Sequence, residues 1–123
     1  YAYQELLNQS SVIAFGTDFP VEDINPIMTY YSAVARKDKS GYPDDGFQTE
    51  NSIGRADALS AMTIFGAYAN FEEDEKGSIE VGKSADFILL DNDLIESSES
   101  RIPLTKVVAT FINGELVFNR RYN

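Results

Sequence analysis

The sequence contains no cysteine, no histidine and no tryptophan among its 123 residues. Without cysteine it can form neither a disulfide framework nor a zinc site with thiolate ligands. Without histidine it lacks the commonest protein metal ligand and the usual general base at neutral pH. A metal bound by these residues alone would therefore depend on the oxygen atoms of aspartate and glutamate side chains.

Positive charge is also scarce, because ten lysines and arginines face twenty aspartates and glutamates and leave a formal net charge of −10. Proteins that bind the nucleic-acid backbone need a positive surface, so this balance argues against a nucleic-acid partner. It also argues against an anionic membrane surface, and no apolar run approaches the roughly 20 residues that span a bilayer. We expect a soluble, acidic surface and a cytoplasmic location.

The first half of the chain alternates extended and helical patterns. The continuous apolar run Val12–Phe15 is typical of a strand buried on both faces. Asn25 followed by Pro26 predicts a helix start, with asparagine as the N-cap and proline at the first helical position. Residues 55–65 predict a further helix whose apolar side chains share one face. Residues 1–9 have the spacing of a helix end.

From Gly77 the pattern becomes strand-like, with predicted strands over residues 78–81, 85–90, 106–112 and 115–119. The pair Asn113-Gly114 between the last two is a strong hairpin signal. We expect an α+β fold in which the helices of the first half pack on an antiparallel sheet. The change of pattern near residues 71–77 divides the chain into residues 1–76 and 77–123.

Asp18 is the one strong candidate for a catalytic or metal-binding residue. It lies just past the predicted strand Val12–Phe15, and active sites of parallel α/β folds form where the strands end. A carboxylate there can accept a proton from a metal-bound water or bind the metal directly as a hard oxygen ligand. An aspartate that caps the following loop is the alternative, and position alone leaves both open.

Four segments carry a family resemblance, in this order along the chain: FGTDFPV at 15–21, the helix with Ala58, Leu59 and Thr63, GSIEVGKSADF at 77–87, and VATFINGELV at 108–117. They resemble motifs of the amidohydrolase superfamily, in particular its amidohydrolase family 3 branch. The resemblance runs from about residue 6 to residue 119, and the third segment is its most specific part. Thr17 stands where serine is commoner, and Gly54 stands where a serine or threonine cap is usual.

This resemblance implies a fragment of a larger fold. Residues 1–76 match the C-terminal end of a TIM-type barrel, with its last strand and helices, and residues 77–123 match the C-terminal part of a small β-sandwich domain. The other barrel strands and the histidine metal ligands are then expected on a missing N-terminal part of the same protein. A barrel strand without neighbours leaves open edges, so a homo-oligomer is a further expectation.

The resemblance also implies an activity, the metal-dependent hydrolysis of non-peptide C–N bonds in a small-molecule substrate. Asp18 matches the aspartate of the eighth barrel strand, which serves as the base and contacts the metal. Arg36 is a candidate contact to the substrate, with a simple helix-end charge as the alternative. A divalent metal, with zinc as the expected ion, belongs to the full-length parent, and we expect none tightly bound to this chain alone.

Two hypotheses follow from the absence of histidine in a chain with these motifs. In the first, the chain is part of a hydrolase and is inactive without the rest. In the second, it is a free-standing structural or binding module that kept the fold and lost the chemistry.

Overall fold

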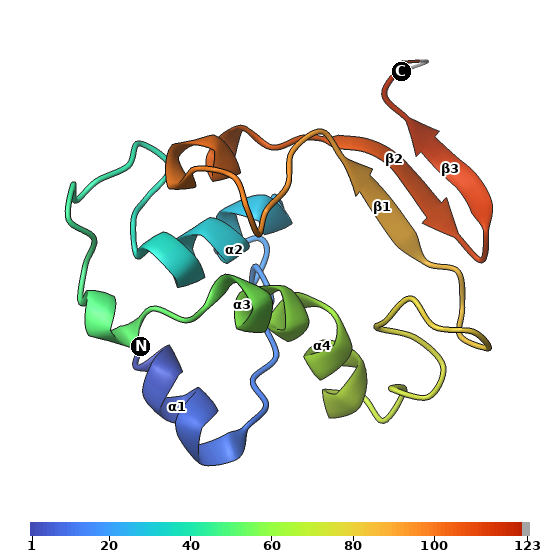
Figure 1. The fold of residues 1–123 in the computed structure, drawn as a ribbon, viewed down its shortest axis with the longest axis horizontal. Helices are drawn as coiled ribbons and strands as arrows, with labels where there is room; N and C mark the ends of the chain where they lie inside the picture. The colour runs from blue at the N-terminus through green and yellow to red at the C-terminus, as the bar shows by residue number, and fades with distance from the viewer. Residues whose placement is uncertain (122–123) are drawn as a thin grey trace.

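The computed structural model describes residues 1–121 and combines helices with a small antiparallel sheet, which confirms the α+β part of the predicted fold class (Figure 1). A mainly helical half is followed by an antiparallel sheet with strand order β1-β2-β3. The elements are α1 (Tyr3–Ser10), α2 (Pro26–Ala35), the 3₁₀ helix η1 (Thr49–Asn51), α3 (Arg55–Met62), α4 (Ile64–Ala69), β1 (Phe87–Leu90), the 3₁₀ helix η2 (Glu99–Leu104), β2 (Val107–Ile112) and β3 (Glu115–Asn119). Within residues 1–121, no helix combines the length and the hydropathy needed to cross a bilayer.

Interactions between neighbouring residues determine where helix α2 begins and ends. The side chain of Asn25 accepts a hydrogen bond of 3.1 Å from the backbone N–H of Ile27, and Pro26 follows as the first helical residue. This confirms the predicted start. The helix ends at Arg36, whose φ of 56° places it in the left-handed region and whose N–H bonds back to Ser32.

The main hydrophobic core is built around α2. Its largest fully buried members, Tyr30 and Ile102, both have 0% exposure, and Tyr31 is 3% exposed. Both tyrosines are therefore core residues. The core also takes in Ile27, Ala33, Ala35, Ile53, Ala58 and Leu94. Side chains from η2 and the loop before it thus complete the packing of α2. Figure 1 shows η2 lying next to α2. The division between residues 76 and 77 stays a prediction.

The helix predicted over residues 55–65 is present but interrupted. Its backbone breaks at Thr63, with φ of −128° and ψ of −96°, between α3 and α4. The hydroxyl of Thr63 donates to the carbonyl oxygen of Leu59 at 2.7 Å, and its N–H bonds to Ser60 rather than continuing the α-helical ladder. This local competition for backbone partners explains why one apolar pattern gives two short helices.

The predicted strand Val12–Phe15 is wrong as a strand. The segment is extended, but within residues 1–121 it forms no strand ladder, and its one interelement backbone hydrogen bond runs from Phe15 N–H to Ala61 O at 2.9 Å. None of its side chains is fully buried. An apolar run predicts burial in an extended form, but a strand also requires a neighbouring strand with which to pair.

The predicted strand over residues 78–81 is also wrong. Ser78 lies in a bend, Ile79 and Glu80 have no regular structure and Val81 begins a turn, and Ile79 is 86% exposed. The hairpin between β2 and β3 is confirmed, because Asn113 and Gly114 both have positive φ, at 51° and 79°, as a type I′ turn requires.

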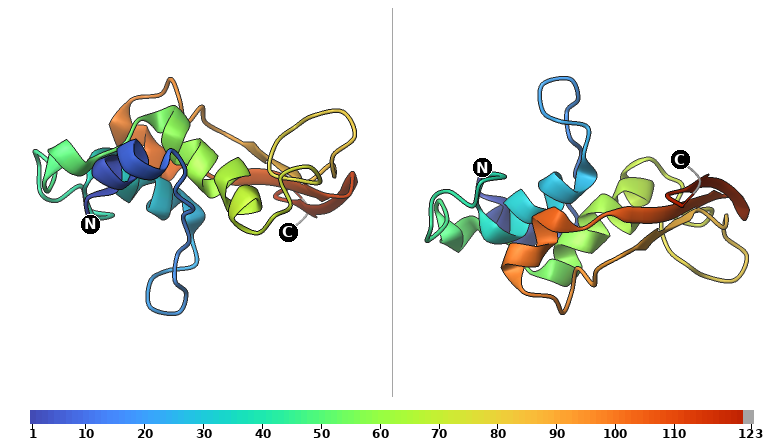
Figure 2. Two further views of the ribbon diagram at one scale, coloured as in Figure 1. Left: turned by 90° about the horizontal axis from the view of Figure 1, so that it is seen from below. Right: turned by 90° about the horizontal axis from the view of Figure 1, so that it is seen from above.

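The expected packing of helices on the sheet is wrong as well. Helix α2 packs on α3 and η2, and the sheet extends to one side of the helices (Figures 1 and 2). Several strand side chains are consequently about half exposed: Ile88, Leu89, Ile112, Leu116 and Val117. The helices of the first half pack on one another and on η2, so no helix in the described part of the chain covers either face of the sheet over most of its area.

Candidate active site

Asp18 lies in a loop over residues 17–24 that projects from the helical half (Figure 2). Its φ of 54° is left-handed, a conformation that aspartate tolerates better than most residues. The turn is closed by a 2.8 Å hydrogen bond from Val21 N–H to Asp18 O, and Thr17 Oγ1 accepts from Phe19 N–H at 3.3 Å. The backbone of Asp18 therefore shapes the turn and leaves its side chain exposed.

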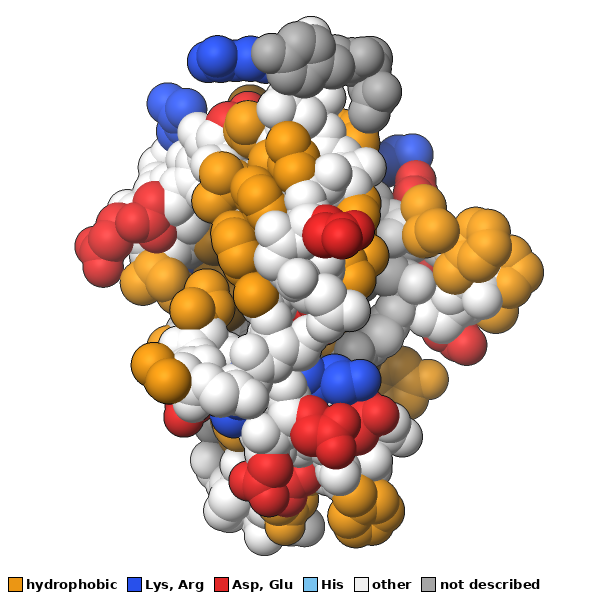
Figure 3. Space-filling view, turned by 90° about the vertical axis from the view of Figure 1, so that its right-hand side faces the viewer, with side chains coloured by type: hydrophobic (Ala, Val, Ile, Leu, Met, Phe, Trp, Pro, Cys, Tyr) orange, Lys and Arg blue, Asp and Glu red, His pale blue; other side chains and the backbone are white. Residues whose placement is uncertain are grey.

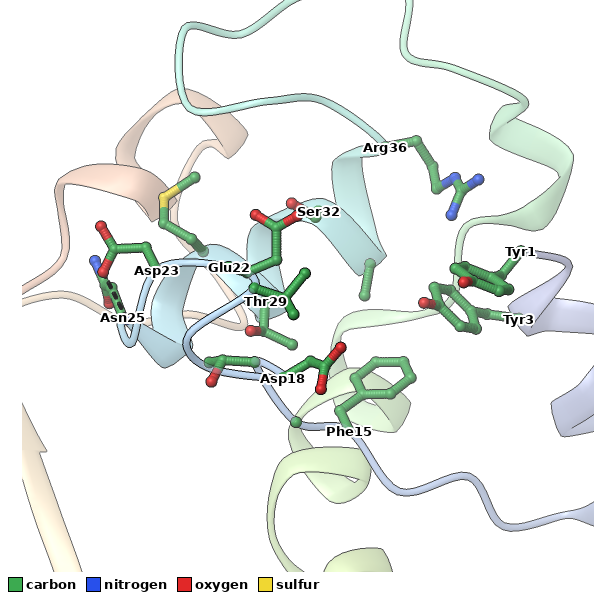
Figure 4. Close-up of a pocket in the computed structure, with 15 residues that line it drawn as sticks. Tyr1, Tyr3, Phe15, Asp18, Glu22, Asp23, Asn25, Thr29, Ser32 and Arg36 are labelled. Atoms are coloured by element: carbon green, nitrogen blue, oxygen red, sulfur yellow. Dashed lines mark hydrogen bonds between the residues drawn. The ribbon is translucent and has the colours of Figure 1, made fainter.

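An open cleft of about 470 Å³ lies between this loop and helix α2 (Figure 4). One wall comes from the extended segment that leads to Asp18, and the opposite wall comes from the less buried face of α2. Aromatic rings from the N-terminal region complete it. The lining residues that carry polar or aromatic groups are Tyr1, Tyr3, Phe15, Thr17, Asp18, Glu22, Asp23, Asn25, Thr29, Ser32 and Arg36. The structure thus brings both predicted site residues, Asp18 and Arg36, to one cleft.

Arg36 links three parts of the chain at the edge of this cleft. Its Nε donates to the carbonyl oxygen of Phe47 at 3.1 Å, and its own carbonyl oxygen accepts from Phe47 N–H at 2.8 Å. Its guanidinium carbon lies 5.8 Å from the centre of the Tyr3 ring, a cation–π distance. Figure 4 shows Arg36 on the aromatic side of the cleft, with Tyr1 and Tyr3, while Asp18 lies next to Phe15.

The acidic groups of the cleft do not make a metal site by themselves. Glu22 and Asp23 line it together with Asp18, but the Asp23 carboxylate accepts a 3.1 Å hydrogen bond from Asn25 N–H. Across residues 1–121, no three acidic side chains come together in a way that could hold an ion. Zinc sites use three or four protein ligands, mostly nitrogen and sulfur, so the donor groups described here do not fit zinc alone.

The acidic run Glu72–Glu75 lies in a turn. Glu72 pairs with Lys76 at 3.2 Å, one helical turn further along. A hydrogen bond from Asn70 and the proximity of Lys76 hold the pKa of Glu72 below its usual range. These contacts are those of a surface turn.

Lys83 and Asp86 in the 77–87 segment have the side chains of site residues, yet both are used within the fold. Lys83 Nζ lies 2.7 Å from Ser78 Oγ and 3.4 Å from Glu80 Oε1. The Ser78 hydroxyl, helped by Lys83, lowers the pKa of Glu80. The carboxylate of Asp86 accepts a 2.7 Å hydrogen bond from Asn113 N–H in the hairpin turn. The segment therefore holds the hairpin in place and is not part of the cleft.

Arg55 is a structural residue that the sequence pattern did not single out. Its Nη1 donates to the carbonyl oxygens of Ile95 at 2.8 Å and Ser97 at 2.5 Å, and more weakly to that of Leu94 at 3.3 Å. A cation in the first turn of a helix is unfavourable for the helix dipole. That unfavourable position is the one signal in the sequence that the Arg55 side chain is stabilised by acceptors outside its own helix.

Comparison with known proteins gives a consistent result. A sequence model of the Amidohydrolase family matches residues 1–118. The chain is 34% identical over 118 residues to the protein LONG AFTER FAR-RED 3 of Arabidopsis thaliana, covering 96% of this chain and 20% of that protein. It is 27% identical over 120 residues to the N-substituted formamide deformylase of Arthrobacter pascens, covering 98% of this chain and 22% of that protein.

The fold has a counterpart among solved structures. The crystal structure of an amidohydrolase from Thermotoga maritima MSB8 matches with a TM-score of 0.67 at 24% identity, over 96% of this chain and 26% of that one. The chain thus spans about a fifth to a quarter of the length of these proteins. Because the family match extends over nearly every residue, from the first helix to the last strand, the chain belongs to the amidohydrolase family.

Proposed function

We propose that this chain is the C-terminal portion of a metal-dependent hydrolase of non-peptide C–N bonds, and that it supplies the catalytic base Asp18. One observation carries the proposal: the exposed Asp18 carboxylate lies on the wall of a cleft of about 470 Å³, in a chain of the amidohydrolase family. A relative is named for its action on N-substituted formamides, which are small molecules with such a bond. Small-molecule chemistry also suits the volume of the cleft.

In this proposal Asp18 accepts a proton from the attacking water as that water adds to the substrate carbonyl. Its place on a tight turn fixes the carboxylate without tying up its oxygens. A divalent metal, with zinc as the expected ion, would acidify the water and polarise the carbonyl when bound. Because the residues described here do not fit zinc alone, its histidine ligands belong to a further part of a longer, cytoplasmic parent.

Arg36 is proposed as a contact to a polar or anionic group of the substrate. It shares the cleft with Asp18, and its Nε is already bonded to Phe47, so its terminal amino groups are left to face a ligand. Arginine forks of this kind recognise carboxylates with two parallel hydrogen bonds. The contact would orient a substrate between the aromatic side of the cleft and Asp18.

The parent architecture is part of the same proposal. Residues 1–76 would form the end of a TIM-type barrel, and the sheet that follows would belong to a small β-sandwich. The likeness in fold to a larger amidohydrolase supports this arrangement. The other strands would then pair with the extended segment before Asp18, which has no ladder partner among residues 1–121.

The decisive experiment compares two aspartates of one cleft in the zinc-loaded parent protein, with a panel of N-substituted amides as substrates. We expect Asp18→Asn to lower kcat about 10²–10⁴-fold, the usual contribution of a general base. Asp23→Asn changes the same chemical group in the same cleft and should leave kcat nearly unchanged. Equal rates for wild type and Asp18→Asn would show that Asp18 is not the base.

A titration of the isolated chain with zinc tests the second half of the proposal. We expect no stoichiometric binding in calorimetry, because the described donor groups form no metal cluster. Tight binding of one zinc per chain would overturn the assignment of the ligands to another part of the parent. A reading frame that starts immediately upstream of Tyr1 would favour the free-standing, non-catalytic module instead.

A further inference from the structure

The outer edge of the sheet is open. Strand β3 is the outermost strand (Figure 1), and among residues 1–121 its backbone pairs with β2 alone. A bulge leaves Val117 without a partner in β2, and Arg120 N–H donates inward to Val108 O at 2.9 Å. Since backbone groups alternate in direction along an antiparallel ladder, the amide of Asn119 faces outward. Such an edge presents unpaired donors and acceptors to another strand.

The side chains along this edge are apolar in the middle and charged at the ends. Leu116 and Val117 are 51% and 54% exposed. Figure 3 looks at the molecule from this end and shows hydrophobic side chains gathered over the upper half, where the sheet lies, with basic side chains at the top. Glu115 opens the strand, and Arg120 and Arg121 follow it.

This order of charges is complementary to itself. When two copies of β3 pair antiparallel about a two-fold axis near Val117 and Phe118, Glu115 of each copy lies opposite Arg120 or Arg121 of the other. The same attractive pair therefore forms twice. Opposite charges placed directly across an antiparallel pair are stabilising, and like charges there are destabilising.

We propose that β3 is a dimerisation edge, through which two copies of this chain join their sheets into one continuous antiparallel sheet. Main-chain hydrogen bonds along β3 give affinity, and the charge order fixes the antiparallel direction. The net charge of −10 opposes association at long range. Salt screens that repulsion beyond about 10 Å at 0.1 M, so the contacts at the edge decide the outcome.

A charge-swap experiment on the whole chain tests this, with the dimer dissociation constant measured by sedimentation. Glu115→Arg makes both ends of the edge basic, and Arg120→Glu with Arg121→Glu makes both ends acidic. Each variant alone should raise the dissociation constant about tenfold or more, because two attractive pairs become repulsive. An equimolar mixture of the two variants should restore association close to that of wild type, now as a mixed dimer.

Matched controls separate the edge from the overall charge. Glu96→Arg repeats the first change in charge, and Lys39→Glu with Arg101→Glu repeats the second, all at exposed positions away from β3. These controls should dimerise like wild type, and circular dichroism should show that every variant is folded. A wild-type chain that stays monomeric at all concentrations would overturn the proposal. So would a mixture of the two edge variants that fails to associate, even if each folds.

Discussion

The hydroxyl of Tyr30 donates a 3.0 Å hydrogen bond to the carbonyl oxygen of Leu94, across a separation of 64 residues. Nη1 of Arg55 lies 3.3 Å from the same oxygen and donates to the next carbonyls of that loop. One side chain from α2 and one from α3 thus hold a single loop of the second half of the chain. The loop in turn brings Leu94 and η2 over the apolar face of α2.

Replacing Tyr30 with phenylalanine removes only this hydrogen bond. We expect the free energy of unfolding to fall by about 1 kcal/mol, since Leu94 O keeps the weaker contact to Arg55. Tyr31→Phe is the matched control, because the Tyr31 hydroxyl makes no hydrogen bond within residues 1–121. Urea unfolding of both variants measures the difference. An equal loss of stability in both would show that the bond to Leu94 contributes nothing.

The ionisation of Tyr30 predicts a loss of stability in alkali. Burial raises the pKa of Tyr30 above 10.0, with Asp93 adding to the rise and Arg55 opposing it. The unfolded chain therefore loses this proton at a lower pH than the folded chain. The stabilisation is fully present below pH 10 and is lost as the pH rises through the folded-state value.

Two measurements follow from this sign. The free energy of unfolding should decrease above pH 10 in the wild type and should decrease less steeply in Tyr30→Phe. Absorbance titration of the folded wild type should show one tyrosine that ionises late and is missing from Tyr30→Phe. A late tyrosine that persists in the variant would assign the shift to another residue.

Asp86 should act on the hairpin and not on catalysis. Asp86→Ala removes the acceptor of the Asn113 N–H, and we expect a local loss of about 1 kcal/mol. Amide hydrogen exchange should become faster in β2 and β3 but not in α2. Asp86→Asn keeps a side-chain oxygen and should restore most of the protection. Unchanged exchange in Asp86→Ala would mean that this hydrogen bond does not hold the turn.

The kinetic constants of Arg36 variants distinguish a role in substrate binding from a purely structural role. In the parent, Arg36→Gln should raise KM about tenfold for anionic substrates and leave kcat nearly unchanged, because binding is lost equally in the ground and transition states. Neutral substrates should show no such rise. Arg36→Lys keeps the charge but loses the Nε donor to Phe47, and should therefore recover KM only in part.

A different outcome would reassign Arg36. If Arg36→Gln lowers the free energy of unfolding and leaves KM unchanged for every substrate, its function is to join α2 to the following loop. Its hydrogen bond to Phe47 and its stacking on Tyr3 are then sufficient to explain the residue.

The elements predicted correctly from the sequence are those that depend on local chemistry. Asn25-Pro26 starts α2 because an N-cap and a fixed φ act within a few residues. Asn113-Gly114 makes its hairpin because both residues accept positive φ. The segment Val12–Phe15 was mispredicted because a ladder depends on a distant partner that a local pattern cannot reveal.

In the candidate site, too, local features could be predicted from the sequence and features that depend on distant residues could not. The sequence points to Asp18 through its place after an apolar run and through the family resemblance, and to Arg36 through the resemblance alone, with a helix-end charge as the alternative. That the two share one cleft could not be predicted, because the cleft depends on where Tyr3 and α2 pack. The position of Arg55 was equally hidden, since its three acceptors lie about forty residues further along the chain.

The cover that η2 gives to α2 has a consequence for biosynthesis. A ribosome releases residues 26–62 long before Leu94 and Ile102, the side chains that complete the packing around Tyr30. During that interval α2 and α3 present an unfinished apolar surface, which is the form of a nascent chain most open to aggregation or to capture by chaperones. Ile102 is therefore one of the last residues to be added to the core around Tyr30. A chain whose synthesis stalls before Ile102 would leave the ring of Tyr30 exposed.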